Sequence, residues 1–508
     1  MAQTRDSEPF AQDRPLDAKT FKKTLADAGY SQEALAETLA ICCPHEHQDV
    51  EVVYRRVKDQ TPYNVLVRLF WLGRDVPESA VAATLPGLNV EQLCNVGLLR
   101  RRDGAVSSNA KLAPYHHLIM ASDFGPEIHH DLPADHVLGV GAASMTLASV
   151  TVRRKVKTAL DLGAGAGIQS FLAASHAERV VGTDTNPRAV SFARFNARLN
   201  DIQGIEWRQG SLYEPVADEK FDLIVANPPF VISPESRFVF RDGGMPGDTI
   251  SEQVIRGAGQ HLSEGAYACI LFNWSHKDQA DWQDRPRSWV SDSGCDGWLI
   301  SFRCAEPLAY AADWLGTTVG RNDPEYGRFL DEWMAYYQQM DIRRISAGAM
   351  ILRRRKARAN WFRGHVLDKG RCLGSAGEQI ERIFAAEDLL ESLDDERQLL
   401  DHRLLFDSHH LLKHELKVEG HGWAVQNEQL VTSQGIPFAG HVDAYVANLL
   451  AGCDGRTTLG RLVEKMAGQL KTEPEKITPG CLAVIQKLLR SGFLNPAKTL
   501  NATDTQRP

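Results

Sequence analysis

Residues 158–167 read TALDLGAGAG, a short apolar run that ends in glycines at positions 163, 165 and 167. The apolar residues predict a buried strand, and the glycines let the backbone turn sharply and approach a ligand without a Cβ in the way. A helix is expected to begin near Ile168. The order strand, glycine-rich turn, helix predicts an α/β fold that binds a ligand at the carboxyl end of a strand.

Further apolar runs follow the first, and each is bounded by Gly, Pro, Asn or Asp. They read ERVVGTDTN (178–186), GIEWRQG (204–210), FDLIVANPP (221–229) and AYACILFNW (266–274). Amphipathic segments separate the first four runs, so the pattern predicts a mostly parallel sheet covered by helices on both faces. A run at 298–304 and the run GAMILRRR (348–355) predict a hairpin that closes the sheet, with a helical insertion around 325–339 between them.

Asp184 stands at the end of the second run. In a doubly wound sheet, an acid at this strand end reaches the ligand crevice and can accept both hydroxyls of a ribose. The alternative is a helix N-cap, a role that either Asp184 or Asn186 could fill ahead of Pro187. Together with the glycine turn, the acid predicts a ligand that carries a nucleoside.

Asn227-Pro228-Pro229-Phe230 follows the fourth run, at the sheet edge where such folds bind ligands. The prolines end the strand and make a stiff corner with unpaired carbonyls. A planar NH2 group can donate to the Asn227 side chain and the Pro228 carbonyl while Phe230 stacks on it, which frees its lone pair to attack a methyl sulfonium. A plain Pro-Pro turn would explain the prolines but not the flanking Asn and Phe. These four residues are the predicted catalytic residues.

With these two motifs, residues 137–273 resemble the class I S-adenosylmethionine-dependent methyltransferases that methylate nitrogen. Within that superfamily the stretch is similar to the HemK-like protein-glutamine methyltransferases and to the small-domain rRNA guanine and adenine methyltransferases. The resemblance implies a Rossmann-like core with a mostly parallel seven-stranded sheet, S-adenosyl-L-methionine as cofactor, and no metal.

The resemblance also implies roles by position. Asp161 and the three glycines would surround the methionine part of the cofactor, and Asp184 would hold its ribose. Ser211 and Leu212 stand where the family commonly has an acid that meets the adenine, so the Leu212 backbone is a candidate for that contact. The cofactor-binding residues expected on this basis are Asp161, Gly163, Gly165, Gly167, Asp184, Ser211, Leu212 and Asn227.

Two flanking segments are expected beside this site. VLGVGAASMTLA (137–148) corresponds to a loop over cofactor and substrate, with Ser144 and Thr146 as polar contacts. FRDGGMPGDTISEQVI (240–255) resembles the glycine-rich segment that lies near the active site of HemK-like enzymes, before a helix.

Three domains are predicted for a chain of 508 residues. Residues 1–130 form a helical, winged-helix-like domain with helices near 18–25, 32–41, 62–72, 78–84 and 90–96 and a wing at 98–107. Residues 131–358 form the methyltransferase domain. Residues 359–508 form an α+β accessory domain, also winged-helix-like, with an acidic helix at 378–400. An ordinary helical packing module explains the first domain about as well as a nucleic-acid contact does.

Composition and charge restrict the remaining functions. The net charge of −8 argues against non-specific nucleic-acid binding, and nine cysteines without a C-x-x-C pair argue against a disulfide framework or a zinc cluster. No apolar stretch is long enough to cross a membrane and the first residues lack a signal-peptide core, so we expect a soluble, cytoplasmic protein. His45, Glu46, His47 and Asp49, and the pair His410 and His414 on a possible helix face, are interpreted as surface residues.

The class of substrate stays open at this stage. A glutamine side chain and an exocyclic base amine are both planar NH2 groups, and the motif accommodates either. Two basic clusters, Arg100–Arg102 and Arg353–Arg358, could hold phosphates. HemK-like enzymes usually carry a shorter N-terminal domain and lack the large C-terminal unit, so the prediction slightly favours methylation of a nucleic-acid base in RNA or DNA. The alternatives are a release-factor type of protein-glutamine N5-methyltransferase and a non-catalytic regulatory protein that only binds the cofactor; oligomeric state is left open.

Overall fold

The computed structural model describes residues 9–39, 49–128, 132–356, 360–367 and 374–497. The chain divides into two compact units, the first made of Met1–Ala148 and Arg154–Asp368 and the second of Ser149–Arg153 and Lys369–Pro508. The three-domain division remains a prediction. No helix in the described ranges is both long and apolar enough to cross a membrane.

The first unit begins with short helices, followed by a small sheet. The helices are α1 (Ala18–Asp27), α2 (Gln32–Leu39), α3 (Val50–Arg56), α4 (Pro62–Leu66) with the π-helical turn η1 (Val67–Trp71), α5 (Glu78–Thr84) and α6 (Val90–Val96). Strands β1 (Val76–Pro77), β2 (Leu99–Arg102) and β3 (Ala105–Ser108) pair in the order β1-β3-β2, and β4 (Lys111–Tyr115) pairs with β5 (Leu118–Ser122). The five predicted helices and the two strands of the predicted wing are confirmed, because the apolar periodicity there is local.

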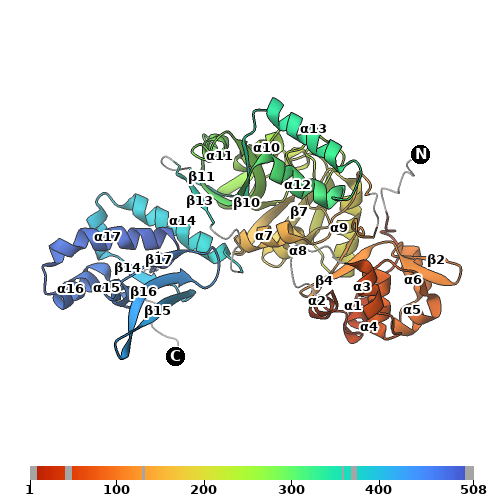
Figure 1. Ribbon diagram of the computed structural model, residues 1–508, viewed down its shortest axis with the longest axis horizontal. Coiled ribbons are helices and arrows are strands. Elements are labelled where there is room, and N and C mark those ends of the chain that lie inside the picture. Colours follow the sequence, from red (N-terminus) through yellow and green to blue (C-terminus); the bar gives the residue numbers. More distant parts are fainter. Residues whose placement is uncertain (1–8, 40–48, 129–131, 357–359, 368–373, 498–508) are drawn as a thin grey trace. The chain divides into compact units, whose positions relative to one another are not determined.

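An eight-stranded sheet forms the centre of the first unit (Figure 1). Its strands are β6 (Val156–Leu162), β7 (Ala177–Asp184), β8 (Ile205–Gln209), β9 (Phe221–Ala226), β10 (Leu262–His276), β11 (Cys295–Ala305), β12 (Arg344–Arg354) and β13 (Phe362–Val366). They lie in the order β13-β11-β12-β10-β9-β6-β7-β8, with β6 to β10 parallel and β12 antiparallel to β10 and β11. The predicted α/β class, parallel core and closing hairpin are confirmed.

The eighth strand, β13, exceeds the predicted seven and lies beyond residue 358, where the methyltransferase domain was predicted to end. It runs parallel to β11. The return from β12 to β13 is held by the buried carboxylate of Asp296, which accepts hydrogen bonds from Arg353 Nη2 at 2.8 Å and Asn360 Nδ2 at 3.1 Å. This contact joins residues far apart in the sequence, so local periodicity could not predict it.

Helices connect and cover the sheet. They are α7 (Ala142–Val150), α8 (Ile168–Ala174), α9 (Pro187–Leu199), α10 (Thr249–His261) and α11 (Asp284–Val290). Because β6 lies between β7 and β9, the carboxyl ends of these three parallel strands are neighbours. The segments that follow them, which carry the glycine turn, Asp184 and Asn227, therefore meet at one edge of the sheet.

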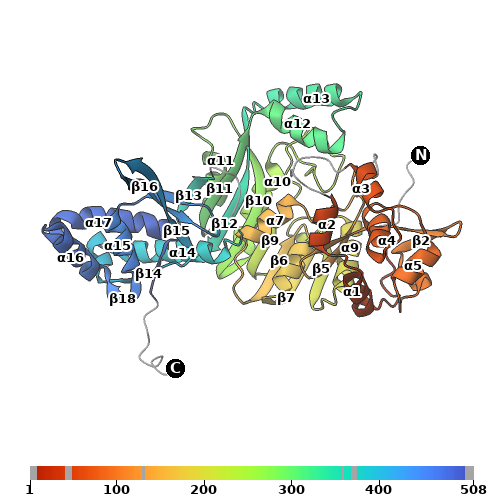
Figure 2. The same ribbon diagram turned by 60° about the horizontal axis from the view of Figure 1, so that its bottom comes forward.

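A two-helix insertion lies between β11 and β12. It consists of α12 (Pro307–Thr318) and α13 (Tyr326–Gln339), which lie side by side in Figure 2. Tyr310, Trp333 and Tyr337 of these helices form a separate apolar cluster with Val231 and Ile232. Helix α13 confirms the predicted helical insertion. The apolar cluster attaches the insertion to the chain just after the Pro-Pro corner.

The second unit combines helices with two small sheets. Its helices are α14 (Gly377–Ser392), η3 (Glu396–Asp401), α15 (Ala444–Ala451), α16 (Leu459–Leu470) and α17 (Pro474–Arg490). One sheet has the order β18-β14-β19, from β14 (Arg403–Phe406), β18 (Asp454–Thr458) and β19 (Leu494–Pro496). The other has the order β15-β16-β17, from β15 (His410–Glu419), β16 (Gly422–Thr432) and β17 (Ala439–His441).

The suggestion of a helix bearing His410 and His414 is wrong. Both residues lie on strand β15, whose residues from Leu412 to Glu419 mostly alternate between apolar and charged side chains, a period of two that suits a strand. His414 faces Glu428 across the hairpin, with 3.4 Å between Nε2 and Oε1. His45, Glu46 and His47 lie outside the described residues.

Candidate active site

The glycine turn after β6 forms one wall of the site. Gly163 and Gly165 have φ of 76° and 55°, and a Cβ added to either would meet no atom closer than 3.9 Å. The amides of Gly163 and Ala164 both donate to the Thr183 carbonyl at 2.9 Å, which fixes the turn to the end of β7. The two glycines therefore leave the space beside the turn open.

Gly167 does not line this space, contrary to the prediction. It is the N-cap residue of α8, and a Cβ there would lie 2.8 Å from Phe171 and 3.0 Å from Trp207. Phe171 and Trp207 fill the space beside Gly167, so this third glycine lets helix α8 approach the sheet closely and does not make room for a ligand.

Asp161 joins the end of β6 to the start of helix α8. Its buried carboxylate accepts hydrogen bonds from the amide and hydroxyl of Ser170, at 2.8 and 2.7 Å, and so secures the first turn of α8. Burial raises the pKa of Asp161 to about 7, although the bonds from Ser170 act in the opposite direction. The residue lies at the cavity wall.

Asp184 ends β7 with its carboxylate against the glycine turn. Oδ2 accepts from the Gly165 amide at 2.8 Å and Oδ1 from the Asn186 amide at 2.9 Å. Burial raises the pKa of this carboxyl group. The N-cap of α9 is Asn186, whose Oδ1 accepts from the Arg188 amide at 3.0 Å. Asp184 is thus not the cap, and its carboxylate, which offers about four acceptor sites, can accept further bonds from a ligand.

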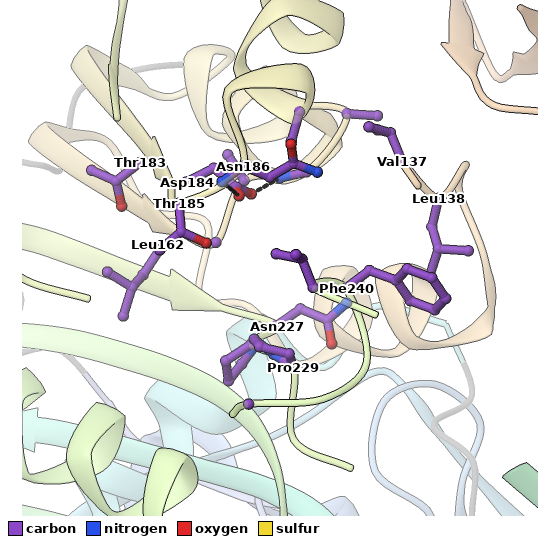
Figure 3. A pocket seen from close by; sticks show the side chains of 18 of the residues that line it. Val137, Leu138, Leu162, Thr183, Asp184, Thr185, Asn186, Asn227, Pro229 and Phe240 are labelled. Atoms are coloured by element: carbon purple, nitrogen blue, oxygen red, sulfur yellow. Dashed lines mark hydrogen bonds between the residues drawn. The ribbon is translucent and has the colours of Figure 1, made fainter. Parts of the chain in front are cut away.

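A cavity of about 580 Å³ lies between these groups and the end of β9, a size typical of small-molecule sites. In Figure 3, Asp184, Thr185 and Asn186 lie on one side of it, Asn227, Pro229 and Phe240 lie on the other, and Val137 and Leu138 lie at one end. The predicted residues that line it are Asp161, Gly163, Gly165, Asp184, Ser211, Leu212, Asn227, Pro228 and Pro229.

Of the two polar contacts predicted from the segment 137–148, only one lines the cavity. Ser144 lines the cavity, whereas Thr146 does not, since its hydroxyl donates to the Ala142 carbonyl at 2.9 Å within α7. Leu212 lines the cavity with a φ of 48°, a left-handed conformation that non-glycine residues rarely adopt outside functional turns.

Phe230 is not among the described residues that line the cavity, and its predicted role against the acceptor group stays a prediction. The chain turns after Pro229 so that Phe230 packs against the cluster of Tyr310, Trp333 and Tyr337 under the inserted helices. Phe240 supplies the aromatic ring at the cavity wall instead, and its ring centroid lies 5.5 Å from that of His136. The only sequence signal for Phe240 was its position at the start of the glycine-rich segment 240–255.

Phe240 belongs to a closed loop, residues 231–242. Its ends meet where Val231 pairs with Asp242, and the Val231 amide donates to the Arg241 carbonyl at 3.2 Å. The buried guanidinium of Arg241 donates to Asp242 Oδ1 and to Glu235 Oε2, both at 2.7 Å. These ion pairs cross the inside of the loop and fix its shape.

The inserted helices hold the same loop from outside. Tyr337 Oη donates to the Ile232 carbonyl at 2.8 Å, and the Ile232 amide donates to Tyr310 Oη at 3.1 Å. Trp333 Nε1 donates to Glu235 Oε1 at 2.9 Å. The 231–242 loop is therefore fixed both by its own ion pairs and by α12 and α13.

The charge at the cavity wall is acidic. Asp161, Asp184 and Asp242 are among its lining residues, whereas no lysine or arginine belongs to the part of the lining that the structure describes. The described lining therefore offers no cationic side chain to a phosphate.

The basic clusters predicted to hold phosphates are largely engaged within the protein. Arg101 pairs with Glu78, with Nη2 to Oε1 at 2.8 Å, and Arg100 Nε donates to Ser107 Oγ at 2.9 Å. In the second cluster, Arg353 bonds the buried Asp296, and Arg354 Nη1 donates to the Gly259 carbonyl at 2.9 Å. Arg358 lies outside the described residues.

Comparisons with known proteins agree with this architecture. Residues 138–279 match the family model described as methyltransferase small domain. Residues 46–109 and 381–496 match two models described as domains of unknown function.

Individual relatives match parts of the chain. A candidate protein N5-glutamine methyltransferase of Methanocaldococcus jannaschii is 35% identical over 136 residues, which are 25% of this chain and 68% of that protein. The release factor glutamine methyltransferase of Aliivibrio fischeri is 44% identical over 75 residues, 14% of this chain and 26% of that protein, so the chain spans only about a quarter of it. A solved ribosomal protein L11 methylase of Lactobacillus delbrueckii aligns with a TM-score of 0.23 at 24% identity, over 32% of this chain and 72% of that one.

The matched segment 138–279 contains the glycine turn, both carboxylates and the asparagine at the end of β9. The Methanocaldococcus jannaschii relative is matched over two thirds of its length at 35% identity. The chain therefore belongs to the HemK-like class I S-adenosylmethionine-dependent methyltransferases.

Proposed function

We propose that this methyltransferase transfers a methyl group to the side-chain amide nitrogen of a glutamine in a protein. The observation that carries the proposal is the position of Asn227, Pro228 and Pro229 at the wall of a cavity whose described lining contains no basic residue. Relatives named as protein-glutamine methyltransferases support it. The preference for nucleic acid drawn from the sequence is not supported, and the glutamine alternative fits better.

The residues present fit S-adenosylmethionine. Gly163 and Gly165 leave open space beside the turn, and Asp184 offers acceptor sites that match the two hydroxyls of a ribose. We assign the methionine end to the glycine turn, the ribose to Asp184 and the adenine to the backbone of Ser211 and Leu212. When bound, this cofactor supplies the electrophilic methyl group.

Asn227 acts on the acceptor amide. Its side-chain oxygen and the Pro228 carbonyl accept the two amide hydrogens, so the nitrogen lone pair is turned out of conjugation with the amide carbonyl. The nitrogen gains the methyl group and then loses one of its hydrogens as a proton to water. Phe240, at the same wall, lies where it can pack against the planar amide.

The rim of the cavity suits a peptide better than a nucleic-acid backbone. Leu138 and Val239, both exposed, line the mouth beside Phe240. The Val239 amide donates to the Ala134 carbonyl at 3.0 Å, which joins the two loops that form this rim. An apolar rim can contact the uncharged main chain and aliphatic carbons around a glutamine, whereas phosphates would find no lysine or arginine in the described lining.

Labelling identifies the substrate class directly. The protein is incubated with methyl-labelled cofactor and a cell lysate, and the products are divided among protease, RNase and DNase treatments. We expect the label to be released by protease alone, and to appear as N5-methylglutamine after acid-free enzymatic digestion. Affinity for total RNA and duplex DNA should be negligible, without the salt dependence that phosphate contacts produce. Label released by a nuclease would overturn the proposal in favour of a base amine.

The ribose assignment makes a separate prediction for Asp184→Ala. The substitution removes two charge-assisted hydrogen bonds to the cofactor, each worth about 1.5 to 3 kcal/mol before compensation. Affinity for S-adenosylhomocysteine, measured by calorimetry, should fall at least about tenfold, the equivalent of about 1.4 kcal/mol. The exposed Asp218→Ala serves as control and should bind normally. Unchanged binding by a folded Asp184→Ala protein would refute the assignment.

A further inference from the structure

The hairpin β15–β16 of the second unit has one apolar and one charged face. Directly paired residues of antiparallel strands point to the same side, so Leu412, Leu416 and Val418 share a face with their partners Leu430, Val425 and Trp423. On this face Trp423 is 71% exposed and Val418 57% exposed. Leu430 is buried at the base of the hairpin, and the pair His414 and Glu428 lies on the same face between Leu412 and Leu416. The hairpin projects beyond the helices of its own unit (Figure 1), and the stripe of apolar side chains toward its tip, Leu416, Val418, Trp423 and Val425, is 47 to 71% exposed. Such a stripe indicates an interaction site.

The outer edge of the hairpin is also available. Strand β15 is the edge of a sheet whose order is β15-β16-β17, and in the described ranges no strand pairs with its other side. All of its residues after His410 are exposed. It contains neither proline nor a bulge of its own, because the extra residue at the register shift, Gln426, belongs to β16. A long, regular free edge can pair with another strand.

The charges along β15 are complementary to β15 itself in one antiparallel register. The charged face carries Lys413, Glu415, Lys417 and Glu419 in alternation. When Leu416 lies opposite Leu416 of a second copy, Lys413 faces Glu419 and Glu415 faces Lys417, and symmetry repeats both pairs. Shifting the centre by one residue, to Glu415 or Lys417, places like charges opposite each other instead, so the charges select this register.

The same lysines lack ionic partners within the hairpin. Neither Lys413 nor Lys417 forms an ion pair with a described residue, while Glu415 and Glu419 accept hydrogen bonds only from the neutral amides of Asn427 and Gln426, at 3.2 and 2.7 Å. All four charges are therefore free to pair with a second chain.

We propose that β15 is the dimer contact of this protein, pairing edge to edge with β15 of a second copy about a two-fold axis through Leu416. The pairing joins the two hairpins into one continuous sheet, makes four opposite-charge pairs and brings the two Leu416 side chains together. The apolar stripes of both hairpins then form one surface centred on the axis. An isologous contact of this kind closes at the dimer, because it uses the β15 edge of both copies.

A charge-swap series tests the pairing with the full-length protein. Glu415→Lys converts two attractive cross-strand pairs into lysine–lysine pairs, so the dissociation constant from sedimentation velocity should rise about tenfold or more. Lys417→Glu should do the same. The double variant E415K/K417E restores opposite charges across the axis and should recover wild-type dimerisation. Glu464→Lys, an equal charge change on the exposed side of α16, is the control and should have no effect.

Hydrogen exchange supplies an independent readout. Amides of residues 411–419 should become more protected as the wild-type concentration rises through the dissociation constant, and should not do so in Glu415→Lys. A wild-type protein that stays monomeric at micromolar concentrations would overturn the proposal. So would a double variant as weakened as the single ones, or protection that is independent of concentration. The mutated side chains are exposed, so folding of each variant can be verified by circular dichroism.

Discussion

Asn227→Ala should lower kcat by roughly 10² to 10³ while leaving affinity for S-adenosylhomocysteine nearly unchanged, the scale expected when one preorganised polar contact to the reacting group is lost. The residue follows β9 at the cavity wall opposite Asp184, as Figure 3 shows. Its side-chain oxygen is assigned to one hydrogen of the acceptor amide, and that bond strengthens only as the nitrogen becomes a nucleophile. The effect should therefore appear in kcat, whereas the Asp184 variant should fail in cofactor binding.

Single-turnover kinetics with a labelled protein substrate would measure this effect apart from product release. Asn227→Asp is the matched variant, because it keeps an acceptor oxygen of nearly the same size. We expect it to retain markedly more activity than Asn227→Ala. Normal turnover by Asn227→Ala would show that the amide-activating mechanism is wrong, even though the chain is a methyltransferase.

Arg241→Met should lower the free energy of unfolding of the first unit by about 3 to 5 kcal/mol, the range for removing one partner of a buried ion pair. Arg241 is 1% exposed, and its loss leaves the carboxylate of Asp242 buried without its cation while Glu235 loses one of its partners. The same change releases the 231–242 loop that carries Phe240, so activity should fall together with stability. Urea unfolding, followed beside hydrogen exchange of residues 231–242, measures both.

Two further variants test whether the ion pairs of Arg241 are the cause of this loss of stability. Arg237→Met removes an exposed arginine of the same loop and should cost little. Adding Asp242→Asn to Arg241→Met removes the uncompensated charge, so the double variant should be more stable than the sum of the single effects predicts. If Arg237→Met and Arg241→Met destabilised equally, the ion pairs inside the loop would not be what fixes it.

The elements of the site that lie within one strand and its turn could be predicted from the sequence. Asp184 and Asn227 are predicted to face one crevice because each directly follows a strand, and the parallel order brings those strand ends together. The packing of Phe230 could not be predicted. The direction of its side chain depends on Tyr310 and Trp333, which reach it from the insertion between β11 and β12, and no local pattern encodes that contact.

In the second unit, too, local patterns predict some elements and long-range pairing decides others. Helices α15 to α17 follow local apolar periodicity, whereas β15 has two adjacent leucines near its start that suit a helix as well as a strand. Its identity as a strand is decided by pairing with β16, whose residues match it from His410 to Glu419. Pairing partners distant in sequence are the information that periodicity lacks.

The attachment of the 231–242 loop to the insertion also sets an order of assembly during synthesis. Ile232 bonds Tyr310 and Tyr337, which follow it by 78 and 105 residues, and Glu235 bonds Trp333 98 residues later. Strands β6 to β9, which position the glycine turn, Asp184 and Asn227, are complete once Ala226 has left the ribosome, but the part of the cavity wall that contains Phe240 must wait for the chain beyond α13. A nascent chain therefore acquires the wall assigned to the methyl donor well before it acquires the wall assigned to the substrate.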